Sequence, residues 1–81
     1  MPRVTFPADL QRYTGGAAEV EVRALNYRDL LEELSRRYPA LDPGSLRRLA
    51  LAIDGVVIHE PLLESFGPDS TLVLVPRIAG G

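Results

Sequence analysis

The chain has 81 residues and a mass of 8.9 kDa, which suits one small domain with a single core. Hydrophobic residues make up 46% and charged residues 25%, close to globular averages, so the composition argues against disorder. The formal net charge is -2 and lysine is absent, which disfavours a nucleic-acid surface built on phosphate contacts.

The absence of cysteine excludes a disulfide framework, a thiol nucleophile and thiolate metal ligands, and one histidine cannot build a histidine-rich site. No run approaches the roughly 18 apolar residues of a membrane span, and no basic start followed by a long apolar run marks a signal peptide. We therefore expect a cytoplasmic protein that binds no metal, no nucleic acid and no membrane.

The first elements are two strands. Alternating apolar and polar side chains predict a strand at residues 3–6 and a second at residues 18–24. Residues 7–14 have a weak pattern, typical of a loop or a short turn of helix, and Gly15-Gly16 lets the chain reverse. We expect the two strands to form a hairpin with a long connection.

A helix follows, with Asn26 as its N-cap and Pro39 as its stop. Asp29 in the first turn and Arg36-Arg37 in the last complement the helix dipole. The apolar positions fall on one side of a 3.6-residue repeat. They are Tyr27, Leu30, Leu31, Leu34 and Tyr38.

The second half of the chain predicts three further strands. Residues 41–49 are interpreted as irregular, with Ser45 as a possible cap for a short turn. Residues 49–53 and 56–58 form a hairpin around the Asp54-Gly55 turn.

Residues 61–66 suit one short helical turn, and residues 67–69 bend the chain before the run Thr71 to Val75. That run is apolar on both faces, which is typical of a central strand.

These elements predict an α+β fold in which one helix covers one face of a five-stranded mixed sheet. If Leu72 meets the helix, Val73 and Val75 point to the open face, with the small Ala50 and Ala52 nearby. An exposed apolar patch of this kind indicates a docking surface, although an ordinary solvent-tolerated patch is the alternative.

No catalytic constellation emerges from the sequence. The best candidates, His59-Glu60, Asp54 and Glu32-Glu33, do not converge. His59 is expected at the solvated end of a strand, and Glu32-Glu33 on the wet face of the helix. We therefore predict no catalytic residues.

Basic side chains occur in two adjacent pairs. Arg37 lies four residues after Glu33, in the order that favours an ion pair on a helix surface. Arg36-Arg37 and Arg47-Arg48 are interpreted as a solvated face or a contact to an acidic protein rather than a phosphate site, since the chain holds eleven acidic residues.

The last residues are Ile78-Ala79-Gly80-Gly81. Two glycines give an extended segment without side chains, which can pass through a narrow channel of another protein and present a free carboxylate. The alternative is a flexible end without function.

With this element order, the chain resembles the β-grasp, ubiquitin-like sulfur carriers of the MoaD/ThiS family over nearly its whole length. The most specific part runs from Gly67 and Asp69 through the apolar strand to Pro76 and the Gly-Gly end, like the family's glycine-aspartate turn, strand, proline and Gly-Gly ending. Weaker matches are the leucine helix ending at Tyr38-Pro39 and the Ile53-Asp54-Gly55 step.

The resemblance implies a β-grasp domain at residues 1–76 and a flexible tail at residues 77–81. It implies a protein co-substrate rather than an enzyme: a ubiquitin-activating-like adenylyltransferase uses ATP to adenylate the Gly81 carboxylate. A sulfur donor protein or sulfide then displaces AMP. The resulting thiocarboxylate would serve a sulfur-accepting synthase in cofactor, cysteine or other metabolite biosynthesis, with no cofactor bound to the chain itself.

The resemblance also implies roles for the residues around the tail. Arg77, Ile78, Ala79 and Gly80 would thread the channel of the activating enzyme. The enzyme would also contact Val73, Val75 and Arg77.

Two alternatives remain at this point. A ubiquitin-like modifier would use the same activated carboxylate to form isopeptide bonds with target lysines, although the absence of lysine forbids side-chain-linked homopolymers. A protein-interaction domain with an inert tail belongs to a different class.

Overall fold

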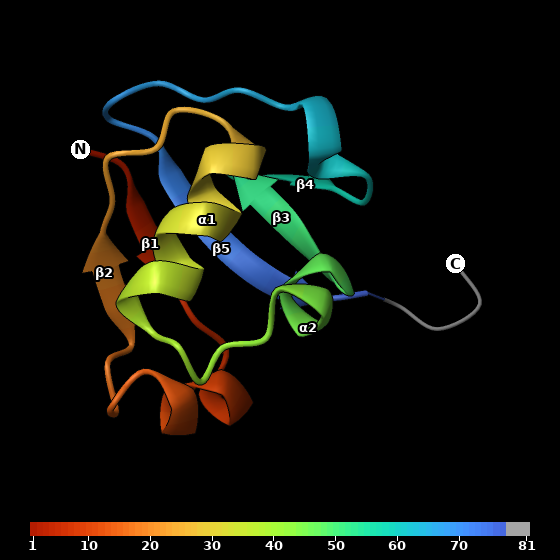
Figure 1. Ribbon diagram of the computed structural model, residues 1–81. Helices are drawn as coiled ribbons and strands as arrows, with labels where there is room; N and C mark the ends of the chain where they lie inside the picture. Colours follow the sequence, from red (N-terminus) through yellow and green to blue (C-terminus); the bar gives the residue numbers. More distant parts are fainter. Residues whose placement is uncertain (78–81) are drawn as a thin grey trace.

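One helix packs across one face of a five-stranded mixed sheet in the computed structural model, which describes residues 1–77 (Figure 1). The strands are β1 (Arg3–Thr5), β2 (Glu19–Glu21), β3 (Leu49–Ile53), β4 (Val56–Ile58) and β5 (Thr71–Pro76). Their order in the sheet is β2-β1-β5-β3-β4. β5 pairs in parallel with β1 and antiparallel with β3, and β2 and β4 form the antiparallel edges. The central position predicted for the last strand is confirmed.

The core lies between the sheet and the helix. Val4 pairs with Val20 on one side and with Leu72 on the other, so three apolar side chains from three strands share one row under the helix. Leu30 and Leu34 of the helix are fully buried against this layer. Burial of these side chains is the main stabilising contribution, because each fully buried leucine or valine contributes about 1.5–3 kcal/mol.

The helix α1 (Tyr27–Arg37) begins and ends where the sequence predicts. Asn26 is the N-cap, and its side-chain oxygen accepts a hydrogen bond from the backbone N–H of Asp29 at 2.9 Å. The rings of Phe6 and Tyr38 meet edge to face, with centroids 5.8 Å apart, beyond the helix end. None of the helices in residues 1–77 is long and apolar enough to cross a membrane.

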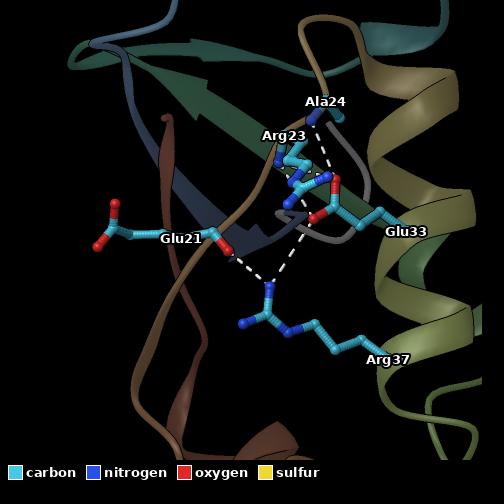
Figure 2. A network of polar contacts seen from close by, with 5 residues as sticks. All are labelled: Glu21, Arg23, Ala24, Glu33 and Arg37. Atoms are coloured by element: carbon cyan, nitrogen blue, oxygen red, sulfur yellow. Dashed lines mark hydrogen bonds and ion pairs between the residues drawn. The ribbon is translucent and has the colours of Figure 1, made fainter.

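Glu33 ties α1 to the segment that follows β2 (Figure 2). Its carboxylate accepts hydrogen bonds from the backbone N–H groups of Arg23 and Ala24, at 2.9 and 3.0 Å. The predicted pair with Arg37 is present at 3.7 Å, and Arg37 also donates to the carbonyl of Glu21. The expectation that Glu32 and Glu33 share a wet face holds for Glu32, which is exposed, but is wrong for Glu33, whose side chain is 19% exposed.

Three short helical segments lie between the strands. The segments η1 (Ala8–Tyr13) and η2 (Pro61–Leu63) are 3-10 turns, as the weak patterns suggested. Residues 43–47, expected to be irregular, instead form the helix α2 (Pro43–Arg47). Ser45 lies inside α2 and is not its cap; the helix starts after Asp42, with Pro43 in its first turn. Leu46 is fully buried, and this tertiary contact stabilises a helix too short to form alone.

The β3–β4 hairpin turns at Asp54 and Gly55, which adopt φ angles of 50° and 88°. These positive values suit a tight hairpin turn and are accessible to aspartate and glycine. The Asp54 carboxylate also accepts hydrogen bonds from the Ser70 hydroxyl at 3.0 Å and the Thr71 N–H at 2.8 Å. The turn therefore fixes the start of β5.

Candidate functional site

The face of the sheet opposite α1 carries an apolar patch. Leu72 and Leu74 of β5 are buried toward the helix, so Val73 and Val75 point to the open face, where both stay partly exposed. The register places Ala52 beside Val73 and Ala50 beside Val75, as the sequence predicts. Val57 of β4 pairs with Ala52 and is 48% exposed, and sequence reasoning missed it. We call Val57, Val73 and Val75, with Ala50 and Ala52, the valine patch.

The other half of the open face is polar. Arg3 of β1 lies between Glu21 of β2 and Thr71 of β5 in the register, and it pairs with Glu19 at 3.6 Å. The valine patch therefore covers only the β5, β3 and β4 side of this face. A partner that buries apolar surface fits that side.

Arg77 follows β5 at the root of the tail. Its guanidinium donates a hydrogen bond to the backbone carbonyl of His59 and pairs with Glu60 at 3.6 Å. Arg77 also lines a cavity against α1, which places its side chain on the helix side of the sheet rather than with Val73 and Val75. Ile78, Ala79, Gly80 and Gly81, the other residues predicted for the tail site, lie outside the described residues.

The catalytic candidates of the sequence are not brought together. His59 is exposed just after β4, and Asp54 is engaged in the hairpin turn by Ser70 and Thr71. Within residues 1–77, no group of three His, Asp or Glu side chains could hold a metal ion.

A cavity of about 660 Å³ lies between α1, α2 and η2. Backbone hydrogen bonds from Tyr27 to Glu64 and from Phe66 to Leu25 hold the segment around η2 against the start of α1. Its lining combines apolar and charged side chains, and we call it the arginine cavity. By its wall we mean the apolar or aromatic lining residues Tyr27, Leu31, Pro43, Pro61 and Leu62, and by its rim the charged ones, Arg28, Glu32, Arg47, Glu60 and Arg77.

Tyr27 forms part of the cavity wall and is only 3% exposed. Burial raises the pKa of its hydroxyl, while the positive charges of Arg47 and Arg77 act in the opposite direction. Arg47 and Arg77 are thirty positions apart in the sequence, yet the charges of both lower the pKa of the same tyrosine. No local pattern in the sequence brings them together, so sequence reasoning missed this site.

In the comparison with protein families, the ThiS family model matches residues 4–81. No curated protein matches the chain by sequence.

Three solved structures are similar over almost the whole chain. SAMP1 from Haloferax volcanii has a TM-score of 0.75 and 22% identity, covering 99% of this chain and 98% of its own. A chain in the BexX/CysO complex of Amycolatopsis orientalis has a TM-score of 0.78 and 20% identity, with 100% of both chains covered. The small archaeal modifier protein 1 from Methanosarcina acetivorans has a TM-score of 0.76 and 22% identity, covering 99% of this chain and 95% of its own. These likenesses show the ubiquitin-like β-grasp fold, as predicted.

Proposed function

Since the chain belongs to the ThiS family, we propose that it is a sulfur carrier whose Gly81 carboxylate is activated and converted to a thiocarboxylate. The observation that carries the proposal is the extent of the family match, which runs over residues 4–81 and so includes Gly80 and Gly81. The chain itself acts as a protein co-substrate, and a partner adenylyltransferase performs the catalysis.

The proposed chemistry has two steps. A carboxylate oxygen of Gly81 attacks the α-phosphorus of ATP, pyrophosphate leaves, and a mixed anhydride with AMP forms. A hydrosulfide ion then attacks the acyl carbon, AMP leaves with the bonding electrons, and loss of the sulfur-bound proton gives the thiocarboxylate. If the donor is instead the persulfide of a sulfur donor protein, the same attack gives an acyl disulfide, and a thiol must then attack the donor sulfur to release the thiocarboxylate and leave a disulfide on the donor side. Adenylation is needed because a free carboxylate is a poor electrophile, and the thiocarboxylate formed is a nucleophile. The chain lacks cysteine, so the terminus is the proposed carrier of sulfur.

The valine patch is the proposed docking surface for the adenylyltransferase. It is apolar, partly exposed and continuous along β5 with the tail root, so an enzyme seated on it would receive the tail directly. One similar solved structure is of a BexX/CysO complex, which supports a partner protein for this fold. ATP is proposed to bind to the partner and no cofactor to this chain.

A ubiquitin-like modifier is the second candidate function. One similar structure is of a protein named a small archaeal modifier. Both functions would start from the same activated Gly81 carboxylate. They differ in the attacking group, which is sulfur for a carrier and a target lysine for a modifier.

Intact-mass analysis tests the proposal directly. The chain is incubated with ATP, the host's activating enzyme and a sulfur donor, with a reaction lacking ATP as the control. A carrier gains the mass of sulfur in place of oxygen, and because it has no cysteine, thiol-specific alkylation of the denatured chain reports only the thiocarboxylate. Higher-mass conjugates that leave an Ile-Ala-Gly-Gly remnant on target lysines after tryptic cleavage at Arg77, without alkylation, would support the modifier instead.

A further inference from the structure

The arginine cavity lies on the opposite side of the sheet from the valine patch, yet the two meet at the tail root. Val75 belongs to the patch and Arg77, two residues later, lines the cavity. Any protein that encloses the tail therefore lies next to both. The volume of about 660 Å³ falls within the range of about 300–1,000 Å³ that is usual for ligand-binding clefts.

Only some of the charged side chains on the rim form ion pairs. Arg77 is paired with Glu60 at 3.6 Å. Within residues 1–77, Arg28 and Arg47 form no ion pair, and three arginines face two glutamates around a cavity in a chain whose net charge is -2. The cavity is thus a locally positive site on an acidic protein.

Beside its apolar side chains, the cavity lining includes two hydroxyl groups that are free to form hydrogen bonds. Tyr27, which is only 3% exposed, adds a hydroxyl group that makes no hydrogen bond to another of the residues 1–77. Ser35 is also a lining residue, and its hydroxyl oxygen is buried without a hydrogen-bond partner among the described residues. Buried polar groups normally have partners, so the unpaired Ser35 hydroxyl beside the cavity favours a polar ligand there.

We propose that the arginine cavity is a second docking site, which takes a segment of the activating enzyme that carries an acidic side chain beside an apolar one. This inference rests on the proposed function. The apolar side chain would pack on Leu31 and Leu62, and its acidic neighbour would pair with Arg47 or Arg28. A polyanion such as a nucleic acid fits less well, because Glu32 and Glu60 on the same rim would repel it.

Charge reversal at Arg47 tests the site, with Arg48 as a matched control. Both are exposed arginines at the end of α2, so both changes place a negative charge at the same helix terminus, but only Arg47 lines the cavity. Affinity for the host's activating enzyme is measured by calorimetry for the full-length chain, Arg47→Glu and Arg48→Glu. We expect about a tenfold or greater loss for Arg47→Glu and less than about threefold for Arg48→Glu. Equal affinities of the two variants would overturn the proposal.

A second measurement does not depend on the enzyme. A capped Leu-Glu-Leu-Glu peptide and a capped Leu-Lys-Leu-Lys peptide are titrated into the labelled chain, and NMR signals of Tyr27, Leu31 and Leu62 are followed. We expect the acidic peptide alone to shift them, and Arg47→Glu to abolish the shift. Equal responses to the two peptides would contradict the proposal. It would also be overturned if removal of residues 78–81 shifted the same signals without peptide, since the occupant would then be the chain's own end.

The outcomes separate this inference from the function it rests on. Failure of the wild-type chain to accept sulfur would refute the carrier proposal, while the peptide titration would still decide whether the cavity takes an acidic segment. Thiocarboxylate formation together with equal binding of Arg47→Glu and Arg48→Glu would refute the cavity site alone.

Discussion

Val75 of β5 lies directly opposite Ala50 of β3 in the antiparallel register. Ala50 is fully buried and Val75 is partly exposed. Because the methyl group of alanine is small, the neighbouring strand does not cover the valine, whose side chain remains available to a partner. The pairing of a small residue with a larger one thus keeps apolar surface accessible beside the tail root.

We expect Val75→Asp to weaken binding to the activating enzyme by about 2 kcal/mol or more, because the new carboxylate would be desolvated without a partner. The folded monomer should lose little stability, since this position is already in contact with water. Val56→Asp is the control: it is the same change at an exposed valine of β4 on the helix side of the sheet. Calorimetric binding and urea unfolding of both variants check this prediction. Similar affinities for Val75→Asp and the wild-type chain would remove the patch from the interface.

Deletion of Gly81 should abolish sulfur acceptance and leave the fold intact, because the residues of the core lie within residues 4–74. The measurement is intact mass after activation, with a circular dichroism spectrum as the control for folding. The carrier proposal is wrong if the shortened chain still gains sulfur.

Glu33→Gln should lower the free energy of unfolding by about 1–2 kcal/mol. Both carboxylate oxygens of Glu33 accept hydrogen bonds from backbone N–H groups, whereas the side chain of glutamine has only one oxygen that can accept them. Those donors are the N–H groups of Arg23 and Ala24, beside the ion pair with Arg37. Glu32→Gln, one residue earlier and exposed, should change stability by less than about 0.5 kcal/mol. Urea denaturation of the two variants measures the difference. A comparable loss in both would mean that the contacts of Glu33 contribute little.

Tyr27 should make stability fall at high pH. Burial raises the pKa of its hydroxyl above the usual 10.0 in the folded chain. As the pH rises, the unfolded chain therefore loses this proton before the folded chain does. The contribution of Tyr27 to the free energy of unfolding is fully present below pH 10.0 and is lost as the pH rises through the pKa of the folded chain. Tyr27→Phe should remove that part of the pH dependence, as measured by urea unfolding across the range. An unchanged slope would show that other groups cause it.

Arg47→Glu should raise the pKa of Tyr27 further, because it removes one of the two positive charges that favour the phenolate. Arg48→Glu, whose charge is not among the causes of the Tyr27 shift, should change it less. Ultraviolet titration of the tyrosines in both variants, with Tyr27→Phe as the reference for assignment, measures the difference. A larger shift in Arg48→Glu would contradict the arrangement around Tyr27.

Elements with local signals could be predicted from the amino-acid sequence. Asn26 caps its helix through a contact three residues away, and Asp54-Gly55 makes a turn that needs only those two residues. Strand geometry predicted that Leu72 and Leu74 share one face and Val73 the other, because neighbouring strand residues point to opposite faces. The run is apolar on both faces, so the burial of Leu72 and Leu74 in the fold decided which face meets the helix. The family resemblance and the open apolar face followed from the same local order.

Features that depend on contacts between distant segments became visible only in the folded chain. α2 forms because Leu46 is buried by the rest of the fold, which outweighs the weak helical signal of its five residues. Glu33 has the local pattern of a solvated helix residue, yet it accepts hydrogen bonds from the backbone N–H groups of Arg23 and Ala24, ten and nine positions earlier in the chain. Arg47 and Arg77 come to one cavity because the segments that carry them pack around α1. Packing and burial depend on which segments meet in space, and the periodicity of residues along the chain does not predict those contacts.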